Sequence, residues 1–174
     1  MSESFIDQEI RIVPWSNHDF VLLHLMNTPK MTEYLGGPET TQQIIARHKL
    51  YLDIGKYGTG QMFSIVLLPY QKKVGIVGYW EREWQKKKVY EIGWGVLPQF
   101  QSKGIASIAV AKAIAIASSE QKHHFIHAFP SINNHTSNAI CRKLNFSLVG
   151  KCDFEYPRGS FMQSNNWRLK IITK

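Results

Sequence analysis

Residues 96–106 read VLPQFQSKGIA, and they join two segments whose apolar residues recur with different periods. Before Pro98, the run VYEIGWGV at 89–96 alternates with a period of two, which is typical of a β-strand. After Gly104 the apolar residues recur at helical spacing to about Ser119. The stretch therefore predicts a strand that passes through a short polar turn into a long helix.

The helix expected over 105–119 leads to a further strand-like run, FIHAF at 125–129. When a helix of that length joins two neighbouring strands, the crossover makes them parallel. Upstream, the runs at 62–68, 74–80 and 89–96 are separated by short polar turns, which predicts an antiparallel meander. The expected fold class is therefore α/β, with helices beside a mixed and mostly antiparallel central sheet.

Shorter patterns extend this arrangement toward both ends of the chain. Ser16 or Asp19 could cap a helix through residues 20–26, and the lysine run at 86–88 is interpreted as a hairpin turn. The remaining elements are expected as strands at 10–13, 147–151 and 166–172, helices at 39–52 and 136–144, and a glycine-containing loop at 55–60.

Length and composition predict one domain over residues 1–174, because 44% of the residues are hydrophobic and 20% are charged. There is no apolar run of about 18 residues, as a membrane helix would need, and the first residues lack the apolar region of a signal peptide. Cys141 and Cys152 form no CxxC pair, so we expect reduced thiols and a cytoplasmic protein.

The net charge of +8 favours an anionic partner, either a nucleic acid or a phosphate-rich cofactor. The turn at 101–106 suits a phosphate, because the first N–H groups of a helix lack partners within it and carry partial positive charge. Gly104 has no Cβ to hinder a ligand, and Lys103 adds a charge. The segment lacks the pattern of a P-loop or a dinucleotide fingerprint. Such a turn can also be a simple connection.

A second polar turn follows the strand expected at 125–129. Asn134 and Ser137 lie three residues apart, at the start of the helix expected over 136–144. An N-cap with a polar first turn explains either residue by itself. It does not explain why the pair follows a crossover unit that carries the other polar turn.

Together these two turns resemble the signatures of the GNAT superfamily of N-acetyltransferases. Gln101-x-x-Gly104-x-Ala106 matches the (Q/R)-x-x-G-x-(G/A) pattern, and Asn134-x-x-Ser137, followed by RKLNF at 142–146, matches a later element. The run EIGW at 91–94, the opening RIVPW at 11–15 and the segment GGP at 36–38 are similar to the RimJ/RimL-type branch, which resembles ribosomal-protein N-terminal acetyltransferases. The sequence departs from the pattern where Asn145 replaces a glycine and where Gln101 replaces the commoner arginine.

The resemblance implies a GNAT-like fold in which the parallel strands ending near Val96 and at 125–129 are splayed apart. It implies acetyl-CoA as the co-substrate, with its pyrophosphate on the 101–106 turn and its pantetheine arm along the strand ending at Val96. A coenzyme of this charge accounts for part of the positive net charge, so a nucleic-acid partner is not required. The cofactor-binding residues implied in this way are Val96, Gln101, Ser102, Lys103, Gly104, Ile105, Ala106, Asn134 and Ser137.

Acetyl transfer to an amine needs a base, donors for the oxyanion and an acid for the thiolate. Glu91 is the preferred base, because it lies on the strand before the cofactor segment, like the glutamate used in similar enzymes; it could equally face solvent, and a water chain could serve instead. Ser137 is the preferred acid and Tyr156 the second candidate, although Tyr156 could simply be a wall of the acceptor pocket. A backbone N–H near Val96 is the expected oxyanion donor.

The acceptor amine stays open between a protein N-terminus and a small molecule. Trp15 and Trp84 could line its cleft. A non-catalytic CoA- or RNA-binding module on the same fold is the alternative function, and the C-terminal strands could pair in a homodimer. No metal is expected, and the histidines at 123, 124 and 127 are interpreted as core or surface residues. Glutamates that could attract a cationic amine, or simply be surface charges, are Glu33, Glu39, Glu81 and Glu155.

Overall fold

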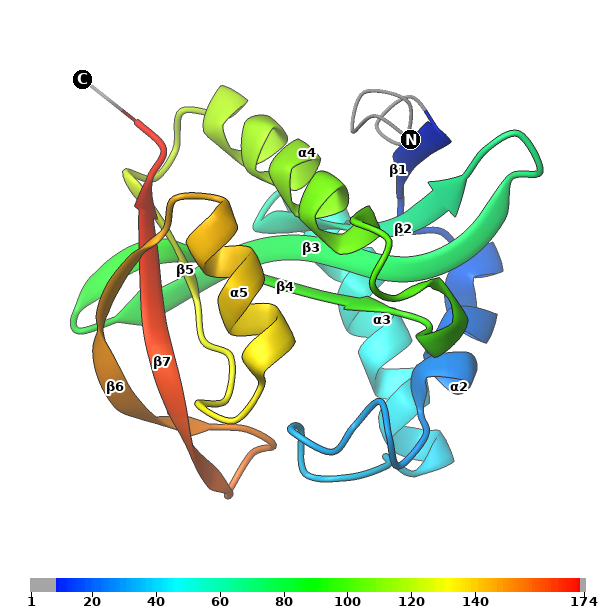
Figure 1. Cartoon of the computed structure of the whole chain (residues 1–174), viewed down its shortest axis with the longest axis horizontal. Coiled ribbons are helices and arrows are strands. Elements are labelled where there is room, and N and C mark those ends of the chain that lie inside the picture. The colour runs from blue at the N-terminus through cyan, green and yellow to red at the C-terminus, as the bar shows by residue number, and fades with distance from the viewer. Residues whose placement is uncertain (1–8, 173–174) are drawn as a thin grey trace.

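A seven-stranded sheet in the order β1-β2-β3-β4-β5-β7-β6 forms the centre of the computed structural model, which describes residues 9–172 (Figure 1). The single-domain prediction also covered residues 1–8 and 173–174, which lie outside the described residues. The strands are β1 (Ile10–Pro14), β2 (Gly60–Leu67), β3 (Lys72–Trp84), β4 (Lys87–Val96), β5 (Phe125–Ala128), β6 (Ser147–Glu155) and β7 (Phe161–Lys170). The helices are η1 (Asn17–Asp19), α2 (Phe20–Met26), α3 (Thr41–Tyr57), η2 (Pro98–Phe100), α4 (Ile105–Ser119) and α5 (His135–Lys143).

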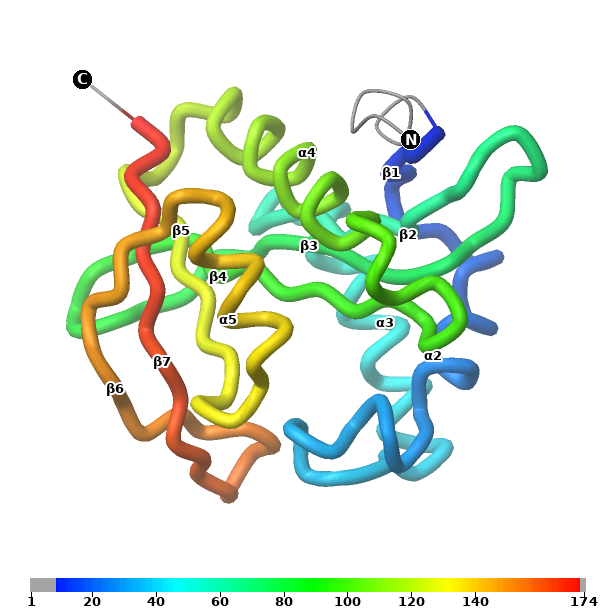
Figure 2. The backbone as a smooth tube through the Cα atoms, in the orientation of Figure 1, coloured from blue at the N-terminus to red at the C-terminus, as the bar shows by residue number. Residues whose placement is uncertain are grey.

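The predicted parallel pair is present, and it is short. Strands β4 and β5 pair only at Tyr90 with Ile126 and at Glu91 with His127, whereas the other neighbouring strands pair in antiparallel fashion. Beyond Glu91, β4 continues to Val96 while the chain after β5 runs in another direction, as the backbone trace shows (Figure 2). The sheet is therefore split at this point, as the GNAT-like fold predicted.

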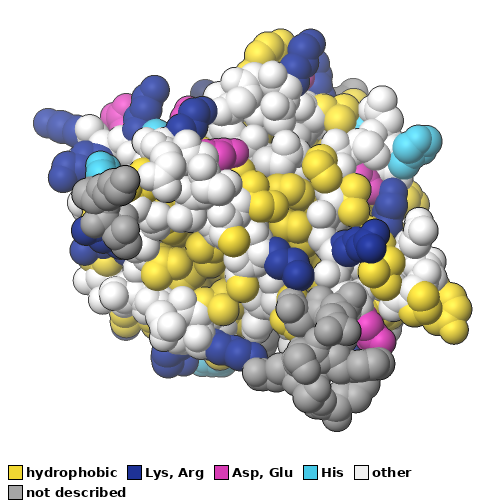
Figure 3. All heavy atoms as spheres, turned by 90° about the horizontal axis from the view of Figure 1, so that it is seen from above, with side chains coloured by type: hydrophobic (Ala, Val, Ile, Leu, Met, Phe, Trp, Pro, Cys, Tyr) yellow, Lys and Arg dark blue, Asp and Glu magenta, His cyan; other side chains and the backbone are white. Residues whose placement is uncertain are grey.

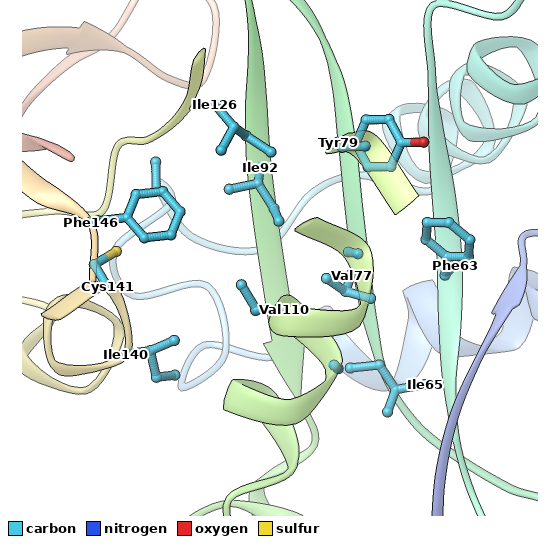
Figure 4. Close-up of a cluster of buried hydrophobic side chains, with 14 of the residues drawn as sticks. Phe63, Ile65, Val77, Tyr79, Ile92, Val110, Ile126, Ile140, Cys141 and Phe146 are labelled. Atoms are coloured by element: carbon cyan, nitrogen blue, oxygen red, sulfur yellow. The ribbon is translucent and has the colours of Figure 1, made fainter. Parts of the chain in front are cut away.

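The helices cover the two faces of the sheet. On one face, α4 packs against β1, β3 and β4 and also contacts α5, while α2 and α3 pack against β3 and β2 on the other (Figure 1). The α4 face holds the larger core. There, Val110 of α4 lies with Val77 and Ile92 of the sheet, and all three are 3% exposed or less (Figure 4).

The predicted helix at 39–52 differs from α3 at both ends. Thr40 and Gln43 form a capping box, so the helix begins at Thr41, and it continues to Tyr57 because Gly58 is the first residue in the left-handed conformation. Gly55 is therefore helical, and its assignment to a loop was wrong. The hairpin turn lies at Gln85 and Lys86, which both have positive φ, so the predicted turn at 86–88 was placed too late and only Lys86 of the lysine run belongs to it.

A carboxylate at the end of α4 ties this helix to the sheet. The hydroxyls of Tyr79 and Tyr90 donate to Oε1 and Oε2 of Glu120 at 2.6 and 2.5 Å. Both tyrosines are fully buried, and burial raises the pKa of each, so both remain neutral donors. These two hydrogen bonds join the crossover helix to β3 and β4, two of the three strands on which it packs.

Replacing Glu120 with alanine leaves two buried hydroxyls without their acceptor. Each such loss costs about 1–3 kcal/mol when the group is cut off from water. Because water reaches this end of the helix and can replace part of the lost bonding, we expect the free energy of unfolding to fall by about 2 kcal/mol in all. Urea denaturation followed by circular dichroism measures it, with Glu83→Ala, at an exposed position of β3, as the control. Equal stability of the two variants would show that the hydrogen bonds of Tyr79 and Tyr90 to Glu120 do not stabilise the fold.

Candidate active site

A cleft of about 810 Å³ opens where β4 and β5 separate. It extends from the floor of the split sheet to the segment between α2 and α3 on one side and the β6–β7 turn on the other. The residues of the sheet and of the β5–α5 loop that line it include Trp80, Glu81, Arg82, Glu91, Ile92, Gly93, Trp94, Gly95, Ala128, Phe129, Ser131, Asn134 and Ser137.

Glu91 lies on the floor of this cleft and is 8% exposed, so its interpretation as a solvent-facing residue was wrong. Its Oε2 accepts hydrogen bonds from Nη1 of Arg82 at 2.9 Å and from Nε1 of Trp80 at 3.2 Å. Burial raises the pKa of Glu91, and the charge and hydrogen bond of Arg82 oppose that rise. The arrangement holds a buried carboxylate whose affinity for a proton is higher than usual.

The sequence patterns did not reveal Arg82. Its guanidinium lies 4.5 Å from the ring centroid of Phe154 and 5.6 Å from that of Phe129. These rings come from β6 and from the loop after β5, and Trp84 of β3 lies 5.9 Å from the same guanidinium, so aromatic rings from both halves of the sheet hold the cation. A cation fixed in this way keeps its charge directed at Glu91.

Two glycines shape the same floor. A Cβ on Gly93 would lie 2.9 Å from a ring carbon of Trp80, and a Cβ on Gly95 would lie 2.5 Å from Cε of Met26. The absence of side chains therefore lets Trp80 and Met26 pack directly on β4. The backbone of β4 beyond Glu91 therefore forms one side of the cleft.

The start of α5 forms another part of the wall. Oδ1 of Asn134 accepts a hydrogen bond from N–H of Ser137 at 3.1 Å, as expected for an N-cap, and both residues line the cleft. The buried Asn138 anchors this turn, because its side-chain amide donates to the carbonyls of Ser131 and Asn134 and its Oδ1 accepts from Nε1 of Trp167. The hydroxyl of Ser137 is thus carried on a rigid helix end.

The 101–106 turn lies beside the cleft and is not part of its lining, and the same is true of Val96. Gly104 is the N-cap of α4 with φ of 79°, and a Cβ built on it would meet nothing within 4 Å. Nε2 of Gln101 donates to the carbonyl of Val96 at 2.8 Å, which links the turn to the end of β4. The first turn of a long helix is therefore open to a ligand at this place.

Tyr156 lies at the other end of the cleft, in the turn between β6 and β7. Its Oη accepts a hydrogen bond from Nη2 of Arg47 at 2.6 Å, and Arg47 also donates to both carboxylate oxygens of Glu39 at 2.7 and 2.8 Å. Burial raises the pKa of Tyr156, while Arg47 opposes the rise. Tyr156 therefore lies in a wall of the cleft and is held by a cation from α3.

Several expected wall residues lie elsewhere. Trp15 is buried against α2 and α3, and the ring of Trp84 packs at a tilt of 50° against that of Phe129. Neither tryptophan lines the cleft. Among the glutamates considered, Glu39 and Glu81 line the cleft, whereas Glu33 and Glu155 do not.

The histidines have protein partners: His123 bonds to Glu81 and His127 bonds to Asn166. Across residues 9–172, no three His, Cys, Asp or Glu side chains are grouped to hold a metal. Cys141 and Cys152 are unpaired, and burial raises the pKa of Cys141 to about 12, so it stays a thiol. None of the described helices is long and apolar enough to cross a membrane.

Lysine and arginine side chains are spread around the face that carries α4 and form no single patch there (Figure 3). A nucleic-acid backbone is usually bound by a continuous basic stripe. The positive net charge of this chain therefore does not point to such a surface on the α4 face.

The family comparison agrees with this geometry, in which the sheet is split, a helix start beside it is open and a buried carboxylate lies between the strands. Residues 9–147 match the model of the acetyltransferase (GNAT) domain, and the chain belongs to this family. It is therefore an acetyltransferase, as predicted, and the non-catalytic alternative is not supported. No curated protein matches the sequence significantly.

Solved structures of acetyltransferases share the fold at low identity. RimL, a ribosomal L7/L12 α-N-protein acetyltransferase in complex with coenzyme A, superposes with a TM-score of 0.75 at 17% identity over 95% of this chain and 96% of its own. Spermidine N-acetyltransferase from Vibrio cholerae, in complex with CoA and spermine, gives 0.76 at 15% identity over 94% and 96%. The microcin C7 self-immunity acetyltransferase MccE, in complex with acetyl-CoA and AMP, gives 0.77 at 17% identity over 95% and 94%.

Removing the charge of Arg82 should raise the pKa of Glu91 further, because burial then acts without the opposing cation. An Arg82→Gln variant with ¹³C-labelled glutamate side chains, titrated by NMR, measures this shift. Arg11→Gln, on the edge strand β1, is the control and should leave the Glu91 titration unchanged. A fall in the pKa, or no change, would contradict the electrostatic coupling.

Proposed function

We propose that this chain is an acetyl-CoA-dependent N-acetyltransferase that moves an acetyl group to a primary amine by direct attack in a ternary complex. The observation that carries the proposal is the position of Glu91, a buried carboxylate on the floor of a cleft where β4 leaves β5. A reactive group placed between the two strands lies within reach of that carboxylate.

The turn at 101–106 and the start of α5 fit the co-substrate. Open space at Gly104 leaves room for a pyrophosphate on the free N–H groups at the start of α4. Lys103 and the net charge of +8 favour an anionic ligand. The pantetheine arm would follow β4 toward Glu91, and Asn134 and Ser137 would contact the thiol end.

The chemistry assigned to the protein residues is acid–base work. Both hydrogen bonds that Glu91 accepts within the described chain reach Oε2, so Oε1 is left to take a proton from the amine, directly or through water. The neutral amine attacks the thioester carbonyl, the new C–N bond forms, and an N–H of β4 near Val96 stabilises the oxyanion. The C–S bond then breaks, and the hydroxyl of Ser137 gives its proton to the thiolate while it regains one, through water, from the cationic nitrogen of the intermediate, which becomes the amide. Tyr156 is the second candidate for this step.

Gly104→Glu should weaken acetyl-CoA binding by about tenfold or more, because a side chain and a negative charge would occupy the proposed phosphate position. Isothermal titration with acetyl-CoA, and separately with CoA, measures both dissociation constants. Gly58→Glu is a matched control, since Gly58 also has positive φ and open space but ends α3. If wild type binds neither ligand at millimolar concentration, the turn is only a connection and the cofactor assignment fails.

The two polar residues should have separable effects on catalysis. Glu91→Gln should lower kcat about 100-fold, whereas Ser137→Ala should lower it about threefold to tenfold because thiolate is a good leaving group. Since burial raises the pKa of Glu91, wild-type kcat/KM should fall as the pH decreases through that raised pKa, and Glu91→Gln should lack this decline. A thiol-release assay measures the rates. If Ser137→Ala loses acetyl-CoA affinity as much as rate, its assignment as the acid is wrong.

A further inference from the structure

We propose that the acceptor is a compact monoamine with an uncharged, apolar or aromatic body. The inference rests on the proposed N-acetyltransferase activity and narrows its substrate class. Three independent features of the cleft carry it: its paired charges, its aromatic walls and the contact that closes its outer side.

The charged side chains that line the cleft are already paired. Glu39 accepts hydrogen bonds from Nε and Nη2 of Arg47, and Glu91 accepts one from Arg82 at 2.9 Å. Glu81 bonds to His123 at 2.9 Å. A second ammonium group on the acceptor would therefore have to break an existing ion pair, and so would a carboxylate or a phosphate. The reacting amine is the exception, because it gives up its proton to Oε1 of Glu91, an oxygen that accepts neither of the hydrogen bonds from Arg82 and Trp80.

The surface between these pairs is mostly apolar. Several rings face the cleft, and the aliphatic side chains of α2 and α3 fill the space among them. Pockets of this kind take the apolar body of a ligand and orient it through a few polar groups. The aromatic residues that line the cleft are Tyr34, Tyr51, Trp80, Trp94, Phe129, Phe154 and Tyr156.

The outer side of the cleft is bridged by two segments that are distant in sequence. A Cβ on Gly36 would lie 2.6 Å from Cδ of Pro157, so the segment before α3 touches the β6–β7 turn, and the backbone trace shows the two approaching each other (Figure 2). The Arg47 to Tyr156 hydrogen bond joins the same two parts of the chain. An extended polypeptide needs an open groove, whereas a bridged cleft of about 810 Å³ suits a small molecule.

Matched pairs of amines test the proposal with the whole protein and saturating acetyl-CoA in a thiol-release assay. Phenethylamine and phenylalanine differ by one carboxylate, and butylamine and putrescine differ by one ammonium. A short peptide with a free N-terminus is the fifth acceptor. We expect kcat/KM to be about tenfold or more higher for phenethylamine than for phenylalanine and for butylamine than for putrescine, and higher for phenethylamine than for the peptide.

Variants of the outer ion pair should change this selectivity in opposite directions. Arg47→Gln leaves the Glu39 carboxylate unpaired, so the preference for butylamine over putrescine should shrink by about tenfold. Glu39→Gln leaves the Arg47 guanidinium unpaired, so phenylalanine should gain on phenethylamine instead. Lys49→Gln removes an exposed pair with Asp53 on the same helix and should leave both ratios unchanged.

The outcomes separate the two levels of inference. Putrescine, phenylalanine or the peptide as the best acceptor would overturn the substrate class and leave the acetyltransferase proposal intact. Thiol release with none of the amines, despite acetyl-CoA binding by titration, would overturn the proposed function and the substrate class with it. The wild-type ratios decide the question even if a variant of the Arg47 pair fails to fold.

Discussion

The separation of β4 from β5 beyond Glu91 is the constraint on which the site depends. Two parallel strands that pair at only two positions leave the rest of β4 without a neighbour on that side. Backbone N–H and C=O groups need partners, and an extended ligand arm can provide them as an added strand would. The split thus creates the cleft and a backbone edge to which a ligand can bind.

The elements around the split keep it open. Glu120 fixes the end of α4 to Tyr79 and Tyr90, just before the point where β4 departs. On the other side, α5 packs its buried Ile140 and Cys141 into the core that α4 also covers. The start of each of these helices lies close to the separated strands, because each follows one of them in the chain. The same connections that form the sheet therefore place the two polar turns.

Local patterns were sufficient to predict these parts. The change of period around VLPQFQSKGIA, the crossover helix and the N-cap at Asn134 each depend on a few consecutive residues. The pairing of Glu91 with Arg82 depended on strand register instead. The turn at Gln85 and Lys86 places Trp80 opposite Glu91, whereas a turn over residues 86–88 would have placed Glu83 there. An error of one or two residues in the position of the turn was enough to prevent the prediction that Arg82 pairs with Glu91.

The contacts on the proposed acceptor side could not be predicted from the sequence, for a different reason. Arg47 and Tyr156 are separated by 109 positions, and only the order of the strands brings β6 and β7 around to face α3. Nothing in either local sequence indicates the other. The three solved structures described above share 15–17% of their residues with the chain, and the descriptions of two of them name acceptors as different as a ribosomal protein and spermidine. The donor site that we propose depends on short local motifs, whereas the acceptor selection that we propose depends on long-range contacts such as those among Glu39, Arg47 and Tyr156.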